Sequence, residues 1–145
     1  MKDLYERLKD RNMKSIEIPK WGPYLRKKWE AAFVSHLSDE DKESIFLHDD
    51  GSFCGYLWHV FSYEKKECLE REKAQDAFRQ QPKKGCYVFY QHSDYALLLE
   101  NASRLSVDDL MDEQDVYVVD KKFNWTYVQT HETGYCGPYF CHRTN

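Results

Sequence analysis

The sequence predicts an α+β fold, with a mostly antiparallel sheet of about five strands and helices packed on one face. Segments with helical periodicity come first, and short strand-like segments follow, interrupted by one more helical segment. Aromatic residues, which favour strands and bury large areas, make up 16% of the chain. A chain of 145 residues can bury one substantial core, so we expect a single domain over residues 1–145.

The chain is expected to begin with a helix over residues 2–11, followed by a short strand over residues 14–18. In the first segment, Leu4, Tyr5 and Leu8 share one side of a helix, which gives a thin apolar stripe on a highly charged surface. The second segment alternates apolar and polar residues and ends at a proline, as edge strands often do.

The clearest helical pattern covers residues 24–37. Its large apolar residues recur at every fourth position: Leu25, Trp29, Phe33 and Leu37. This spacing places them on one face of a helix. Ser38 can then cap a short helix over residues 39–46, because its hydroxyl can accept a hydrogen bond from the first turn.

The middle of the chain predicts a turn, a buried strand and a long helix. Residues 48–52 are rich in Asp, Gly and Ser, which favour turns. Residues 53–62 are nearly all apolar, and their length and boundaries favour a buried strand over a helix. Residues 63–81 are mostly polar and are expected to be helical up to Pro82, which stops the helix.

Two hairpins are predicted in the second half of the chain. Residues 86–91 and 95–100 are strand-like and flank a short turn. Residues 106–111 can form a capped helical turn between the hairpins. Residues 116–119 then alternate between two faces, and residues 125–130 return as the partner strand. This second hairpin is the expected centre of the core.

His131 and Glu132 follow the last predicted strand and are the first candidates for chemistry. An imidazole beside a carboxylate can act in general acid–base catalysis, with the carboxylate orienting the ring. Neighbouring side chains on a strand point to opposite faces, so the two share a site only if the chain bends. Gly134, Gly137 and Pro138 permit such a bend. The alternative is a strand end at which the histidine bonds only backbone groups.

His59 and His92 extend this hypothesis, because both are predicted to lie on strands or strand ends of the same sheet. A lone histidine on an apolar strand face, such as His59, is more often a satisfied core residue than a ligand. If neighbouring strands bring these residues close to His131, a polar pocket results. The candidate catalytic residues are therefore His131, Glu132 and His59, with His92 as a further contributor.

Carboxylates cluster around the predicted helical turn in the second half of the chain: Asp108, Asp109, Asp112, Glu113 and Asp115. Such clusters are usually solvated faces. The more specific interpretation is a docking surface for a basic protein partner, such as a cationic toxin or nuclease.

Metal binding is a weaker hypothesis. His131, Cys136, Cys141 and His142 are ligand types that zinc prefers, but their spacing departs from the paired cysteine knuckle and the last two lie at the chain end. The chain has five cysteines and no CxxC motif. We therefore predict no metal and no other cofactor, and expect reduced, mostly buried thiols.

Composition argues against two classes of partner. The net charge is −4, from 21 basic and 25 acidic residues, so the chain has no basic excess with which to bind nucleic acid or an anionic membrane. No apolar run approaches the roughly 20 residues of a membrane span. The charged first ten residues lack the apolar core of a signal peptide, so a cytoplasmic location is expected.

Several motifs together resemble a known family. They are Trp125-Thr126, Thr130-His131-Glu132 and Gly137-Pro138-Tyr139-Phe140, with the earlier segments WGPYLRKKWE and CGYLWHVFSYEKKECL. Over nearly the whole chain, the sequence resembles a small uncharacterised family from Bacillus and related Firmicutes, the domain of unknown function 4275. This resemblance implies a source and a fold class. It implies no catalytic residues.

Two functional hypotheses follow from these observations. The first is a non-enzymatic protein-interaction module of the immunity or antitoxin type, favoured by the aromatic content, the acidic cluster and the lack of a catalytic signature. The alternative is a hydrolase-type enzyme with a site centred on His131 and Glu132.

Overall fold

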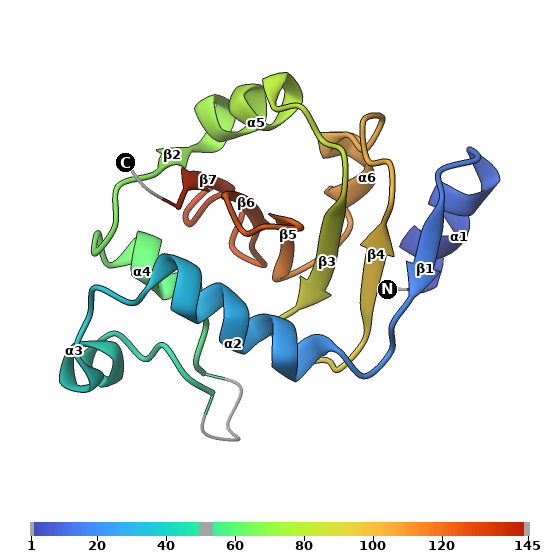
Figure 1. Ribbon diagram of the computed structural model, residues 1–145. Coiled ribbons are helices and arrows are strands. Elements are labelled where there is room, and N and C mark those ends of the chain that lie inside the picture. Colours follow the sequence, from blue (N-terminus) through green and yellow to red (C-terminus); the bar gives the residue numbers. More distant parts are fainter. Residues whose placement is uncertain (1, 50–53, 144–145) are drawn as a thin grey trace.

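The computed structural model describes residues 2–49 and 54–143 (Figure 1). In this part of the chain, seven strands form one antiparallel sheet in the order β1-β4-β3-β5-β6-β7-β2. The strands are β1 (Ser15–Glu17), β2 (Leu69–Glu70), β3 (Cys86–Tyr90), β4 (Ala96–Leu99), β5 (Val116–Asp120), β6 (Trp125–Gln129) and β7 (Tyr139–His142). The predicted α+β class and antiparallel sheet are confirmed, but the predicted number of about five strands is too low.

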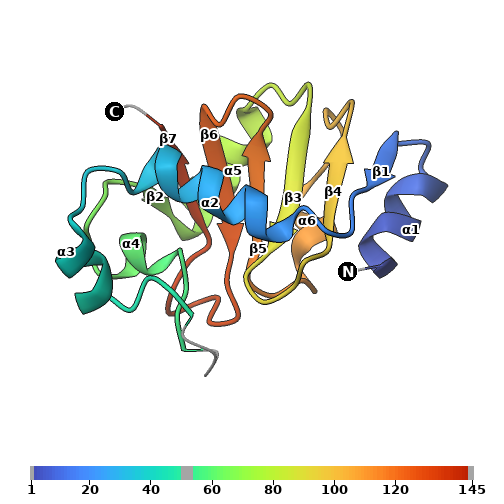
Figure 2. The same ribbon diagram turned by 60° about the horizontal axis from the view of Figure 1, so that its bottom comes forward.

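Helices cover both faces of this sheet. On one face, α1 (Lys2–Asp10), α5 (Arg71–Gln80) and α6 (Val107–Leu110) contribute to one apolar cluster. On the other face, α2 (Gly22–Phe33) and α4 (His59–Ser62) contribute to a second. Figure 2 shows α2 in front of the sheet and α5 behind it. The short α3 (Asp39–Ser44) buries no residue.

The prediction that helices pack on one face is therefore wrong, and the strand burial explains why. All residues of β6 are buried, as are all but the last residue of β5. A central strand that is apolar on both sides needs cover on both sides. Thus Trp125 and Tyr127 enter the cluster beneath α5, while Val128 enters the cluster beneath α2.

Both predicted hairpins are confirmed. β3 pairs with β4, and β5 pairs with β6 with Val118 opposite Tyr127. The predicted helix that becomes α2 is also present, with Leu25, Trp29 and Phe33 buried.

The two strands that were not predicted lie at one edge of the sheet. No strand was predicted over residues 139–142, yet they form β7 between β6 and β2. Pairing on both sides buries Tyr139, Phe140 and Cys141. Short strands such as β2 have no local pattern, because their pairing partner lies about 70 residues away in the chain.

The prediction of a buried strand over residues 53–62 is wrong. Residue 53, like most of the predicted turn over residues 48–52, lies outside the described residues. The rest is a loop followed by α4, and two of its backbone N–H groups donate to side chains of the sheet region instead of to a neighbouring strand. Leu57 N donates to Gln91 Oε1 at 2.9 Å, and Trp58 N donates to the Tyr117 hydroxyl at 3.1 Å. The segment is apolar because it packs on the sheet. An apolar run in the sequence does not distinguish such a packed segment from a buried strand.

The long helix predicted over residues 63–81 is shorter than expected. It begins only at Arg71, because the residues before it pair with β7 and Arg71 N donates to Pro138 O at 2.9 Å. No helix in the described ranges is long and apolar enough to cross a bilayer.

One buried polar chain ties α2 to the sheet. Trp29 Nε1 donates to Thr126 Oγ1 at 2.9 Å, and this hydroxyl donates to Val118 O at 2.9 Å. Trp29, Thr126 and Val118 are all fully buried. Inside a protein, a donor that loses its acceptor pays its full desolvation cost.

We predict that Thr126→Val lowers the free energy of unfolding by about 1–3 kcal/mol, because valine keeps the shape and leaves the Trp29 N–H unpaired. Thr126→Ser keeps the hydroxyl and is the matched control. Urea unfolding followed by tryptophan fluorescence measures both. Equal stability of Thr126→Val and the wild type would contradict this account.

Candidate functional site

Three histidines meet around the ring of Tyr56. The ring centroids of His59, His92 and His131 lie 5.3, 5.1 and 5.0 Å from that of Tyr56. The rings of His92 and His131 therefore lie on the same tyrosine ring and close to each other. Trp58 stacks on Tyr56 at 5.0 Å and completes the cluster.

Sheet topology explains this convergence. β5 is antiparallel to both β3 and β6, so β3 and β6 run in the same direction and end at the same end of the sheet. His92 lies two residues beyond β3, and His131 lies two residues beyond β6. Asp115 directly precedes β5 and therefore lies at this same end.

Asp115 holds the His131 ring. The Nδ1 atom of His131 lies 3.0 Å from both carboxylate oxygens of Asp115, and the His131 backbone N–H donates to Oδ1 at 3.2 Å. Trp58 Nε1 donates to the same oxygen at 2.9 Å. Because a carboxylate only accepts hydrogen bonds, Nδ1 must donate and carry a proton. Asp115 is 8% exposed, so these bonds are shielded from solvent.

Glu132 lies at the other side of the same ring, with Oε1 3.7 Å from His131 Nε2. The chain leaves the strand here, because residues 131–135 form a turn. The Thr130 hydroxyl holds this turn by accepting from Glu132 N at 3.1 Å and by donating to Cys136 O. The structure thus brings His131 and Glu132 to one place, which an extended strand would not do.

His92 forms a second histidine–carboxylate pair, with Nδ1 3.0 Å from Asp49 Oδ2. This ring lines two cavities. One, of about 470 Å³, lies between α2 and the loop after β3, and the other, of about 380 Å³, is also lined by Asp115. His131 and Glu132 are not among the residues that line them. Of the two pairs, His92 with Asp49 is therefore the one open to the larger cavity.

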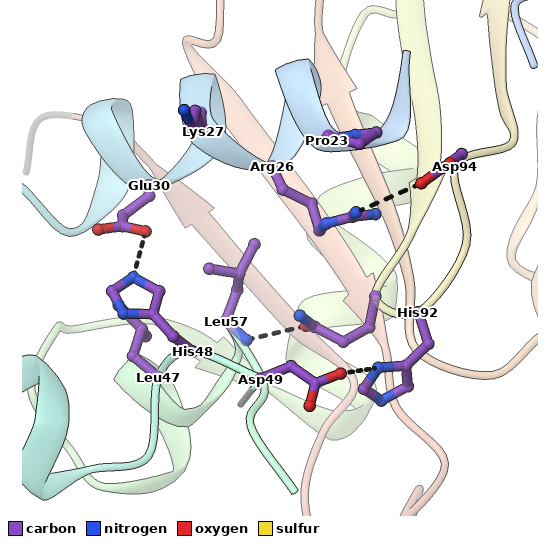
Figure 3. A pocket seen from close by; sticks show the side chains of 11 residues that line it. Pro23, Arg26, Lys27, Glu30, Leu47, His48, Asp49, Leu57, His92 and Asp94 are labelled. Atoms are coloured by element: carbon purple, nitrogen blue, oxygen red, sulfur yellow. Dashed lines mark hydrogen bonds and ion pairs between the residues drawn. The ribbon is translucent and has the colours of Figure 1, made fainter. Parts of the chain in front are cut away.

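The walls of the larger cavity carry paired charges (Figure 3). Glu30 Oε1 lies 2.6 Å from His48 Nε2, and Glu30 Oε2 lies 3.0 Å from Lys42 Nζ. Burial alone would raise the pKa of Glu30, but its hydrogen bonds with Lys42 and His48 outweigh burial and lower it. Arg26 reaches toward Asp94 at 3.9 Å. The cavity therefore offers polar groups of both signs and no single strong charge.

His59 is held differently from the other two histidines. Its Nδ1 atom lies 2.9 Å from the backbone carbonyl of Phe46, and its ring also contacts Trp58 and Tyr63. Among residues 2–49 and 54–143, no carboxylate is bonded to its ring. The structure therefore places His59 in the cluster as a packing partner of Tyr56.

A buried polar network supports the cluster from below. The Tyr117 hydroxyl donates to Gln91 Oε1, and it accepts from Trp58 N at 3.1 Å. Full burial raises the pKa of Tyr117 well above its ordinary value. Burial, followed by the charge of Asp115, also raises the pKa of Tyr56. Both phenols therefore stay protonated at neutral pH, and that of Tyr117 serves as a hydrogen-bond donor.

Sequence reasoning placed Asp115 on a docking face and did not connect it to His131. The sheet register contains the signal that was missed. Val116 pairs with Gln129, so Asp115 stands opposite Thr130 and next to His131. Tyr56, Trp58 and Gln91 were not predicted as site residues, because their contacts depend on a loop whose path no local pattern fixes.

The five carboxylates of the predicted acidic face do not behave alike. Asp108 and Asp112 are exposed, whereas the other three are buried and bonded. Asp109 Oδ1 lies 2.6 Å from Arg11 and its other oxygen closes a capping box with Ser106. Glu113 accepts from the Tyr90 hydroxyl, and Asp115 holds His131 as described above.

The four residues considered for zinc do not come together. Within residues 2–49 and 54–143, no group of three His, Cys, Asp or Glu side chains lies close enough to hold a metal ion. Cys141 and His142 belong to β7, where their side chains point to opposite faces.

A comparison of the chain with known families gives one result. A family model described as domain of unknown function (DUF4275) matches residues 1–140. No curated protein and no solved structure matches the chain. The resemblance noted in the sequence is therefore confirmed for the family.

The cysteines differ strongly in their surroundings. Burial raises the pKa of Cys68 and of Cys86 to about 12, and the pKa of Cys141 to about 11. Cys54, in contrast, is exposed. Since the thiolate is the reactive form, Cys68, Cys86 and Cys141, whose pKa values are raised to about 11 or 12, should be inert at neutral pH.

We predict that, in the native protein at pH 8, a thiol reagent modifies Cys54 first and leaves Cys68, Cys86 and Cys141 almost untouched. With a pKa of about 11 or above, only about one thiol in a thousand or fewer is ionised at that pH. Alkylation followed by peptide mass spectrometry measures each site. Denatured protein, in which all five cysteines should react, is the control. Rapid labelling of native Cys86 would contradict its burial.

Proposed function

The chain belongs to the family described as domain of unknown function (DUF4275), and we propose that it is a hydrolase-type enzyme with His131 as its general base. The observation that carries this proposal is the pair of hydrogen bonds from His131 Nδ1 to the buried carboxylate of Asp115. This contact fixes both the orientation and the tautomer of the ring, as catalytic histidines require.

The proposed chemistry follows from the two ring nitrogens. With its proton on Nδ1, His131 has the lone pair of Nε2 available to accept a proton from water. As the water oxygen forms its bond to the electrophilic atom of a substrate, Asp115 stabilises the imidazolium that results. The bond between the electrophilic atom and the leaving group then breaks while the proton passes from Nε2 to the leaving group, and the ring returns to its first state. Glu132, 3.7 Å from Nε2, can receive or deliver a proton at this end.

His92 is proposed as the second acid–base group. It is oriented by Asp49 as His131 is by Asp115, and both rings contact Tyr56. It also lines the two cavities in which a substrate could sit. Two imidazoles at one site allow one to accept a proton while the other donates one.

The interaction hypothesis based on the acidic cluster draws less support from the geometry. Only Asp108 and Asp112 of the five predicted docking residues are exposed, and the exposed large apolar residue between them in the sequence is Met111, which is neither aromatic nor arginine. Interfaces gain most of their affinity from buried aromatic or arginine anchors. An immunity-like role of this face therefore stays a prediction from composition, while the histidine cluster has a defined geometry.

We predict that the purified protein hydrolyses at least one member of a panel of nitrophenyl carboxylic and phosphoric esters. His131→Gln should lower the rate by about 10²–10⁴-fold, because general acid–base catalysis typically contributes that much. Asp115→Asn should also lower it, because an amide can present the Nδ1 atom with a donor instead of an acceptor. Release of nitrophenolate measures the rate.

His142→Gln is the matched control, since His142 is an exposed histidine of β7 whose ring contacts Phe140 and which pairs with Trp125, at the end of β6 opposite to His131. It should retain the full rate. Circular dichroism should show that all variants are folded. Full activity of His131→Gln, or a wild-type protein inert toward every member of the panel, would count against the proposal.

A further inference from the structure

On the α2 face, one strip of the sheet is not covered by any helix of the described residues. In register, Ile16 of β1 lies opposite Leu98 of β4, and Leu98 lies opposite Tyr87 of β3. Residues that are directly opposite in a sheet point to the same face. The next residue in this row, Val119 of β5, is fully buried. The row therefore runs from the covered core out to an open edge.

The uncovered part of this row is apolar and accessible. Ile16 is 38% exposed, and Leu98 and Tyr87 are partly exposed. Figure 2 shows why, because α2 crosses the sheet and leaves the upper ends of β3 and β4 without a helix in front of them. We call Ile16, Leu98 and Tyr87 the open row.

Two exposed aromatic rings border the open row. Trp21 is 44% exposed and stacks on Tyr87, with ring centroids 6.1 Å apart. Tyr24 is 52% exposed and meets Trp21 edge to face at 5.2 Å. Exposed Trp and Tyr side chains grouped around apolar residues are typical of interface centres.

Lysines border the opposite side. Backbone hydrogen bonds continue across the same strands just beyond the open row. Glu100 N donates to Lys14 O, and Lys121 N donates to Gly85 O. The Lys121 side chain lies over Gly85, where a Cβ atom would come within 2.4 Å of its Cδ.

A third lysine adds to this positive border. Lys28 Nζ lies 6.0 Å from the ring centre of Phe123, which in turn packs against Tyr87 at 6.2 Å. Glu100 is the carboxylate in this ladder, and it is already 2.8 Å from Lys14. The charge next to the open row is therefore positive, although the whole chain carries a net charge of −4.

We propose that the open row is a docking surface for an acidic segment of a protein partner that inserts an apolar side chain between Trp21 and Ile16. The apolar side chain covers Leu98 and Tyr87, which removes exposed apolar surface from water. Carboxylates on both sides of it pair with Lys121 and Lys28. Charge complementarity selects an acidic partner over a basic one. This inference concerns a surface away from His131 and does not depend on the proposed catalytic function.

Synthetic peptides test the proposal directly. The probe is a short peptide of glutamates interrupted by phenylalanines. One control peptide replaces the phenylalanines with alanines, and another replaces the glutamates with lysines. We expect the probe to bind and to shift the NMR signals of Leu98, Tyr87 and the Trp21 indole, while both controls bind at least about tenfold more weakly.

Variants of the protein localise the binding. Ile16→Lys and Lys121→Glu should each weaken binding of the probe by about tenfold or more, which corresponds to about 1.4 kcal/mol. Lys73→Glu on α5 and Tyr135→Ser in the turn after β6 are matched controls, because both positions are exposed and lie away from the open row. They should bind as the wild type does.

Several results would overturn the proposal. One is that the alanine peptide or anionic lipid vesicles bind as well as the probe, since binding would then need charge alone. Another is that the probe does not bind at all. A third is that sedimentation shows a dimer of this chain that Ile16→Lys abolishes, because the open row would then be covered by a second copy.

Discussion

The carboxylate of Asp115 is the contact on which the candidate site depends. It joins three segments that are distant in the sequence, since it accepts from the Trp58 indole before α4 and from both the backbone and the ring of His131 after β6. A buried carboxylate is tolerated only when its oxygens are bonded in this way. The hydrogen bonds that satisfy the buried Asp115 carboxylate therefore also hold two other parts of the site in place. These are the loop that carries Tyr56 and the ring of His131.

The sheet supplies the frame for this contact. The C-terminal ends of β3 and β6 lie at the same end of the sheet, although the two strands are not consecutive in the chain. His92 and His131 follow these strands and therefore lie close together. Cover on both faces leaves the strand ends as the place where polar groups can gather. The open row is a consequence of the same architecture, since α2 covers only part of its face. The protein thus presents a polar cluster at a strand end and an apolar row beside β1.

The sequence predicted those helices and strands whose apolar pattern is visible within a single segment. The fourfold spacing of Leu25, Trp29 and Phe33 follows from burial of one side of a helix, which a single segment displays. Strands β5 and β6 are buried on both sides, and their short runs of β-branched and aromatic residues identify them as strands. Strands β2 and β7 depend on each other across the chain, so neither has a signal of its own. The pairing of His131 with Asp115 is likewise a matter of register, and sequence alone identified both residues without connecting them. Whether His131 and Glu132 share a site was left open by the sequence, because it depends on how the chain turns after β6, where Gly134 and Gly137 adopt positive φ.

The central claim is that Asp115 fixes the His131 ring with its proton on Nδ1 and with Nε2 left to accept another. NMR correlation of ring nitrogens and carbons in ¹⁵N-labelled protein tests it most directly, at a pH at which the imidazole is neutral. We predict that His131 is found as the Nδ1–H tautomer and that Asp115→Asn removes this preference, whereas His142→Gln leaves it unchanged. A His131 ring that carries its proton on Nε2 in the wild type, or that keeps its tautomer without the carboxylate, would contradict the account.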